Sequence, residues 1–157
     1  MNTTVGTRYE KLALELVEQL RLNSALSTLE PSSGATNRIR GASGFPHQID
    51  LSLSDSSRLF LFELKCYTKA IGVEQLLVLA SRRADIAAAF PSKTVLASLV
   101  SKLQPSRNVP PLAKHFGIEV RVVESLHSYS LSFAGDHFIG HHEQAHATDS
   151  VSVVRSE

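Results

Sequence analysis

Residues 47–65 read HQIDLSLSDSSRLFLFELK and contain the pattern that decides the fold. Apolar and polar residues alternate over 47–53, which predicts a strand with one buried face. The stretch 58–66 is apolar on both faces as far as its glutamate, which predicts a central strand. The polar segment 54–57 between them is typical of a turn. The two strands are therefore expected to form a hairpin inside a sheet.

Helical and extended segments surround this hairpin on both sides. The further elements expected are an amphipathic helix over 7–22, a loop over 23–37 with a short strand near 25–29, a helix over 72–90, a strand over 93–100, a short helix over 106–116, and strands over 118–123 and 127–133. This order predicts an α/β (α+β) domain with a mixed central β-sheet flanked by helices.

The composition of the 157-residue chain changes after residue 124. Residues 1–124 carry a charge balance of +4, whereas residues 125–157 carry −3 and hold five of the seven histidines. We expect one folded domain over 1–124, and over 125–157 an extra strand followed by a mobile tail. The single cysteine excludes an intrachain disulfide framework, and neither a signal core nor a membrane-length apolar run is found. A cytoplasmic protein without a membrane partner is expected.

Three charged residues interrupt the predicted hairpin. Glu63 and Lys65 are two residues apart on one strand and therefore share a face, and Asp50 lies in the neighbouring strand. Burying a charge costs several kcal/mol unless it is paired or binds a metal. Two carboxylates beside a lysine suit Mg²⁺ and an attacking water. The alternative is a structural ion pair of Glu63 with Lys65 or Arg58.

An acid-x-Lys tripeptide is uninformative by itself, since about 0.6 are expected by chance in this composition. Its context is more specific. Over about residues 6–124 the chain resembles the PD-(D/E)xK nuclease superfamily, in particular Mrr-type restriction endonucleases and archaeal Holliday junction resolvases. Ile49 stands where that superfamily commonly has proline. The matching segments, in order, are Gly6-Thr-Arg-Tyr-Glu10, Arg40-Gly-Ala-Ser-Gly44, Asp50, Glu63-Leu64-Lys65, Ile71-Gly-Val-Glu-Gln75, and the strand-helix-strand over 93–98 and 113–120.

The resemblance implies a restriction endonuclease-like core and a role for each matched residue. Asp50 and Glu63 would bind Mg²⁺, for which Mn²⁺ would substitute, and Lys65 would position or activate the water. Glu10 would support the metal or its water shell, and Gln75 would orient the lysine or the phosphate. The alternative for Glu10 and Gln75 is an ordinary solvated position on a helix.

Several other residues are candidate contacts to DNA. A basic residue is individually more often a solvated surface charge, and the glycines near Ser43 either let a ligand approach the backbone or simply turn the chain. The candidate nucleic-acid contacts are Arg38, Arg40, Ser43, Lys69, Arg82, Arg83 and Arg107.

The resemblance implies a metal-dependent endodeoxyribonuclease of the restriction, defence or repair type. A double-strand cutter of this size is expected to be a homodimer, and a partner subunit could supply sequence specificity. The alternative is a non-catalytic module of nuclease fold that binds nucleic acid or another subunit. A second motif, His142-Glu-Gln-Ala-His146, matches the zinc-peptidase pattern H-E-x-x-H. Its flanks lack the apolar stripe of a packed helix, so we expect adventitious metal binding at most.

Overall fold

The computed structural model describes residues 28–65 and 69–122, and the backbone of the strands at 128–133, 136–144 and 149–155. By its internal contacts the chain forms two compact units. One is Leu29–Val122, and the other combines the chain ends, Met1–Thr28 and Val123–Glu157. No helix among the described residues is both long and apolar enough to cross a membrane. The helix expected over 7–22 lies outside the described residues.

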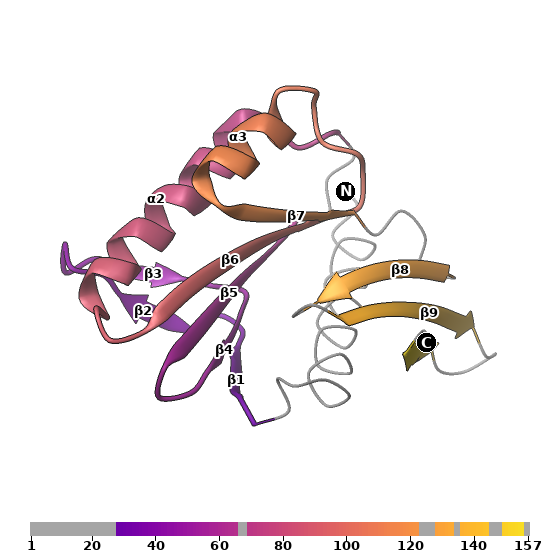
Figure 1. Ribbon diagram of the computed structural model, residues 1–157, viewed down its shortest axis with the longest axis horizontal. Helices are drawn as coiled ribbons and strands as arrows, with labels where there is room; N and C mark the ends of the chain where they lie inside the picture. The colour runs from indigo at the N-terminus through magenta and orange to yellow at the C-terminus, as the bar shows by residue number, and fades with distance from the viewer. Residues whose placement is uncertain (1–27, 66–68, 123–127, 134–135, 145–148, 156–157) are drawn as a thin grey trace. The chain divides into compact units, whose positions relative to one another are not determined.

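The Leu29–Val122 unit is built on a five-stranded sheet in the order β1-β4-β5-β6-β7. Its strands are β1 (Glu30–Ser33), β4 (Leu51–Ser54), β5 (Arg58–Lys65), β6 (Thr94–Ser101) and β7 (Ile118–Val122). The pairs β1/β4 and β4/β5 are antiparallel, whereas β5/β6 and β6/β7 are parallel. Two helices, α2 (Val73–Ala89) and α3 (Val109–Phe116), connect the parallel strands and cover one face (Figure 1). The predicted α+β class with a mixed central sheet is confirmed.

Both helices end where the sequence predicts. Gly72 caps α2, and the chain leaves this helix at Phe90, just before Pro91. Helix α3 has prolines in its first turn and ends at Gly117, whose φ of 62° is left-handed and favours glycine. The bounds of both helices, of β6 and of β7 agree with expectation to within three residues.

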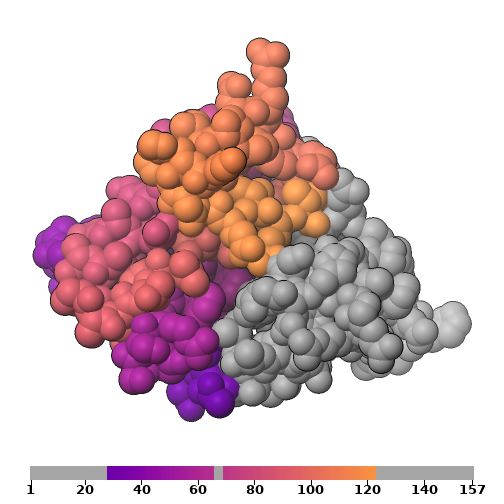
Figure 2. Space-filling model, viewed as in Figure 1, coloured from indigo at the N-terminus to yellow at the C-terminus, as the bar shows by residue number. Residues whose placement is uncertain are grey.

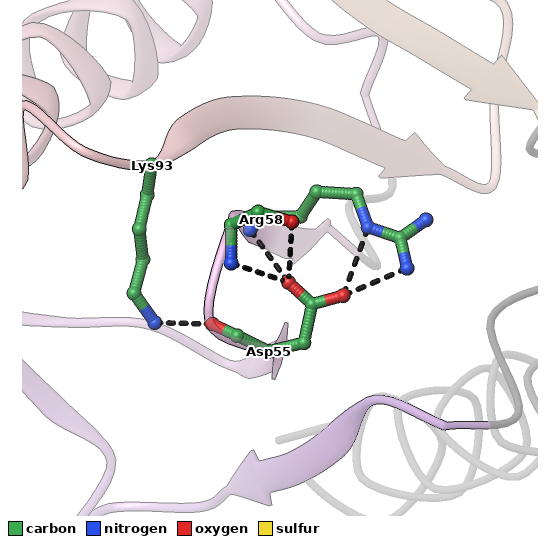
Figure 3. Close-up of polar contacts among 4 residues, drawn as sticks. Asp55, Arg58 and Lys93 are labelled. Carbon is green, nitrogen blue, oxygen red and sulfur yellow. Dashed lines mark hydrogen bonds and ion pairs between the residues drawn. The ribbon is translucent and has the colours of Figure 1, made fainter.

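The β4–β5 hairpin also forms as expected, around a turn fixed by Asp55. The Asp55 carboxylate accepts the backbone N–H groups of Ser57 at 2.8 Å and Arg58 at 2.7 Å, and it pairs with the Arg58 guanidinium (Figure 3). Lys93 donates to the Asp55 carbonyl from the start of β6. These bonds set the register Leu51↔Phe62, which brings the residue before β4 beside the end of β5.

The strand expected over 47–53 is divided into two. Its first part is β3 (Pro46–Gln48), which pairs with β2 (Arg38–Arg40) in a separate two-stranded sheet. Buried Asn37 explains the break, because its side-chain amide donates to the carbonyls of Ser32 and Ile49, each at 2.9 Å. The Asn37 carbonyl also accepts the N–H of Ile49. The Asn37 side chain, twelve residues before Ile49 in the sequence, therefore takes the place of the hydrogen bonds between strands at this point.

The core lies between the sheet and its two helices. On β5, Leu59 and Leu61 face the helices, with Glu63 and Lys65 at the following positions on the same face. Full burial of a leucine side chain contributes about 1.5–3 kcal/mol. The main members of this core are Ile49, Leu59, Leu61, Ile71, Leu76, Leu79, Ile86, Val95, Leu99, Val109 and Ile118. On the opposite face Leu53 and Phe62 are also buried, so β5 is apolar on both faces as predicted.

The strands described in the other unit are β8 (Ser128–Phe133), β9 (Asp136–Gln144) and β10 (Asp149–Arg155), in the antiparallel order β10-β9-β8. Strand β8 was expected, and the structure adds β9 and β10 beyond it, in the segment where a mobile tail was predicted and no strand was expected. The signal overlooked is alternation, since valines at 151 and 153 are interleaved with serines. His142 lies on β9, an extended strand rather than the helix that H-E-x-x-H chemistry requires. His146 lies outside the described residues.

Candidate functional site

The three residues singled out in the hairpin meet at the carboxyl end of β5. Glu63 and Lys65 are alternate residues of this strand and both face α2. Asp50 directly precedes β4, and its Oδ2 accepts the backbone N–H of Leu64 at 2.8 Å. This bond fixes the Asp50 carboxylate next to the backbone that carries Glu63. In open α/β sheets, ligands bind outside the carboxyl ends of parallel strands, and this group of side chains lies there.

Glu63 is the most enclosed charge of the group, with 7% of its surface exposed. Its Oε1 lies 2.7 Å from the Lys65 ammonium and 3.2 Å from Nη1 of Arg82 on α2. Two cations at one oxygen offset the cost of burying the carboxylate. Its Oε2 is also buried but has no hydrogen-bond partner among the described residues. One oxygen of the carboxylate is thus used by the protein and the other is left as an unused acceptor.

The structural alternative is partly present in these contacts. The Glu63–Lys65 ion pair exists, whereas Arg58 pairs with Asp55 and takes no part. Buried polar atoms nearly always find a partner, because an unmet hydrogen bond costs about 1–3 kcal/mol. An ion pair serving stability alone gives no reason to leave Oε2 buried and unmatched, so the ion pair by itself does not account for the arrangement.

An open cavity of about 170 Å³ lies over Glu63 and Lys65, whereas Asp50 is not among its lining residues; it has room for several waters or for a phosphate group. Gln75 is among its lining residues, and its Oε1 accepts the N–H of Gly72 at 3.0 Å, which holds the side chain at the start of α2. The cavity is lined by Glu63, Lys65, Glu74, Gln75, Val78, Leu79 and Arg82. The predicted association of Gln75 with Glu63 and Lys65 is thus present in space.

The donor set fits a hard divalent cation. Within 28–65 and 69–122, no group of three or more histidine, cysteine, aspartate or glutamate side chains gathers as a metal cage. Mg²⁺ does not need such a cage, because it is usually held by one or two carboxylates together with waters and substrate phosphates. Asp50 and Glu63 supply two carboxylates, and Glu63 Oε2 is an acceptor in need of a partner. Glu10 lies outside the described residues.

The candidate DNA contacts divide into separate groups. Arg82 belongs to the site, where its Nη1 also lies 3.5 Å from the carbonyl of Gln48. Arg83 is engaged elsewhere, because its guanidinium donates to the carbonyls of Val95, Phe116 and Gly117. These bonds anchor α2 to the start of β6 and to the end of α3. The Arg83 donors that make them are not available to a phosphate. The exposed residues Arg38, Arg40, Ser43, Lys69 and Arg107 lie outside the cavity lining.

Sequence reasoning missed Asp85, which organises the loop before β3. Its carboxylate accepts the N–H of Ser43 at 2.8 Å and the Ser43 hydroxyl at 2.6 Å, and it lies 2.7 Å from Nε2 of His47. These contacts, first those of Ser43, lower the pKa of Asp85 to about 2. A Cβ on Gly41 would lie 1.9 Å from Asp85 Oδ2, so a larger residue there would displace the Asp85 carboxylate. An acid within a helix gives no local signal of this role.

Comparisons with known proteins support the fold alone. No family model and no curated protein matches the chain. Among solved structures, the crystal structure of a protein of unknown function, AF1548, superposes with a TM-score of 0.54 at 14% sequence identity. The alignment covers 74% of this chain and 57% of that protein, so the chain spans little more than half of its structural neighbour. The likeness is one of architecture.

Proposed function

We propose that this chain is a metal-dependent nuclease of the PD-(D/E)xK type that hydrolyses phosphodiester bonds in DNA. One observation carries the proposal. Asp50, Glu63 and Lys65 converge at the carboxyl end of a central strand, and a buried oxygen of Glu63 has no partner among the residues that the structure describes. A carboxylate acceptor that can bind a cation, with a lysine beside it, suits metal-assisted hydrolysis of a phosphodiester.

Asp50 and Glu63 would hold Mg²⁺, or Mn²⁺ in its place. Bound there, the metal would polarise the phosphate and offset the charge that develops on its oxygens. The protein fixes both carboxylates in advance, since Leu64 N–H orients Asp50 and Arg82 restrains Glu63. Arg82 also lies near the Gln48 carbonyl and so connects α2, β3 and β5 at the site.

Lys65 would position the attacking water and stabilise negative charge on the phosphate. About a quarter of its side chain is exposed, 23%, whereas that of its partner Glu63 is 9% exposed. The lysine therefore lies on the solvent side of the pair and lines the cavity. A substrate entering the cavity would meet the ammonium before it meets the carboxylate. Gln75, held by the helix cap, would restrain the lysine or the phosphate from the other wall.

The wider features of the proposal follow from this chemistry. One such site cuts one strand, so a double-strand cutter would act as a homodimer, with specificity supplied by its loops or by a partner subunit. DNA is the proposed partner, and the cytoplasm is the proposed compartment. The competing function is a non-catalytic module of the same fold, which would bind nucleic acid or a subunit without cutting.

Glu63→Gln separates these two functions. The change keeps the size of the side chain but weakens its affinity for a cation, so we expect Mg²⁺-dependent cleavage to fall at least 100-fold while DNA binding measured in EDTA is retained. Glu30→Gln, at an exposed carboxylate of β1, is the matched control and should cut at the wild-type rate. Unchanged cleavage by Glu63→Gln would refute the proposed site. DNA binding by the wild type without cleavage, on duplex and branched substrates alike, would favour the module.

A further inference from the structure

The loop that joins β2 to β3, residues 41–45, presents an aromatic side chain to solvent; we call it the β2–β3 tip. Phe45 is 62% exposed, the highest value for a large hydrophobic residue in the described part of the chain. The tip belongs to the purple projection at the left edge of the molecule in Figure 2. An exposed aromatic ring leaves most of its apolar surface available to a partner, and aromatic residues are enriched at binding surfaces.

The tip is held in place by many hydrogen bonds. The carboxylate of Asp85 on α2 accepts two bonds from Ser43, and the Asp85 carbonyl accepts the N–H of Ala42 at 3.0 Å. Within the loop, the Gly41 N–H donates a hydrogen bond to the Phe45 carbonyl, and Gly44 adopts a left-handed φ of 83°. Phe45 is therefore displayed on an ordered frame, and little conformational entropy remains to be lost when a partner binds.

The surroundings of Phe45 indicate what kind of partner would fit. Its ring packs against His47, with centroids 5.2 Å apart. Arg38 and Arg40 are exposed at alternate positions of β2, so they share a face of the two-stranded sheet. Arg40 also donates to the carbonyl of Gly44 and so lies against the tip. Because His47 is paired with Ile39, the ring packed against it lies on the other face of this sheet from Arg38 and Arg40, and of the two arginines Arg40 is the one bonded to the tip. An aromatic ring and a guanidinium at the same tip suit a base and the phosphate next to it.

This surface continues into the candidate active site. Arg38 is paired in register with Gln48, whose carbonyl lies 3.5 Å from Nη1 of Arg82. The same nitrogen lies 3.2 Å from Oε1 of Glu63. Arg82 and Asp85 are three residues apart on α2, and Asp85 contacts His47, against which Phe45 packs, so a path of polar groups runs from Glu63 along α2 and β3 to the tip. A nucleic-acid strand with its phosphate in the cavity could follow this path toward Phe45.

We infer that Phe45 stacks on an unpaired base of the substrate, while Arg40 binds a neighbouring phosphate. The inference rests on the proposed nuclease function and names the class of DNA that the site would take. A base inside an intact duplex offers no free face to an aromatic side chain, whereas single-stranded, gapped or branched DNA does. The preferred substrate is therefore DNA with unpaired bases near the scissile phosphate.

The test is DNA binding in EDTA, read from 2-aminopurine placed at successive positions of a single strand and of the matching duplex. Stacking on Phe45 should quench the fluorescence of the single strand, and Phe45→Ala should weaken its binding about tenfold and abolish the quenching at that position. Phe45→Trp should retain both. Phe116→Ala, at another exposed phenylalanine, is the matched control and should resemble the wild type.

Equal affinity of wild type and Phe45→Ala for the single strand would overturn the inference, as would equal affinity of the wild type for single strand and duplex. A shift of Phe45→Ala from dimer to monomer in sedimentation, with DNA binding unchanged, would also overturn it and make the tip a contact between copies. Because the assay contains no metal, its result is separate from that of the cleavage test. Absence of the stacking signal in the wild type, with intact cleavage, would reject the role of Phe45 alone.

Discussion

At the scale of single residues, the candidate site depends on the unequal environments of two oxygens. Glu63 Oε1 is matched by Lys65 and Arg82, whereas Oε2 is buried without a partner in the described part of the chain. Asp55 at the β4–β5 turn shows the opposite situation, since both of its carboxylate oxygens accept hydrogen bonds. Asp55 accepts bonds from Ser57 and Arg58, first of all from the Arg58 side chain, and these lower its pKa to about 2.

The lowered pKa of Asp55 predicts how the stability of the fold changes in acid. Its folded-state pKa lies below the ordinary value of 3.8, so its charge stabilises the fold fully above about pH 4, and this contribution is lost as the pH falls toward 2. Asp55→Asn keeps acceptors for the turn but removes the charge. Urea unfolding at steps from pH 6 to pH 2.5 should show wild type more stable than the variant above pH 4, with the difference shrinking below it. A difference that stays constant or grows toward acid would contradict this explanation; Glu30→Gln serves as the control.

At the scale of elements, local patterns predicted most of the fold. The continuous apolar run of β5, the segment between Gly72 and Pro91 around α2, and Gly117 after α3 are signals within a few residues of the element they define. The break between β3 and β4 could not be predicted in this way, because it depends on Asn37, which is distant in sequence. The sequence could place Asp50, Glu63 and Lys65 on adjacent strands, but not the contact with Arg82 or the buried Oε2. Those depend on how α2 packs on the sheet.

Asn37→Ala tests whether this side chain divides the strand. The substitution leaves the carbonyl groups of Ser32 and Ile49 without their donor, so the free energy of unfolding should fall by about 1–3 kcal/mol in urea titrations. Because Ile49 is adjacent to Asp50, activity should fall as well, by disorder of the site rather than by lost chemistry. Thr36→Ala, at the exposed neighbour, should leave both unchanged. Wild-type stability of Asn37→Ala would show that the break has another cause.

At the scale of the whole molecule, the order of the strands explains where the chemistry lies. The change from antiparallel to parallel pairing occurs at β5. Asp50, which precedes the antiparallel neighbour β4, therefore lies on one side of this strand, and α2 leads to the parallel neighbour β6 on the other side. Both helices cover one face of the sheet and both follow the carboxyl ends of strands (Figure 1). The likeness between this chain and AF1548 concerns the fold alone. Function in this account depends on the site and not on the architecture.

The measurement that tests the central claim most directly is nicking of supercoiled plasmid by the full chain in Mg²⁺, Mn²⁺ or EDTA. Lys65→Ala is compared with Lys114→Ala, which removes an exposed lysine of α3. We expect the wild type and Lys114→Ala to cut only when a divalent metal is present. Lys65→Ala should be slower by roughly 100-fold or more, because the charge beside the phosphate is gone. Cleavage that persists in EDTA, or a Lys65→Ala variant that cuts at the wild-type rate, would contradict the account.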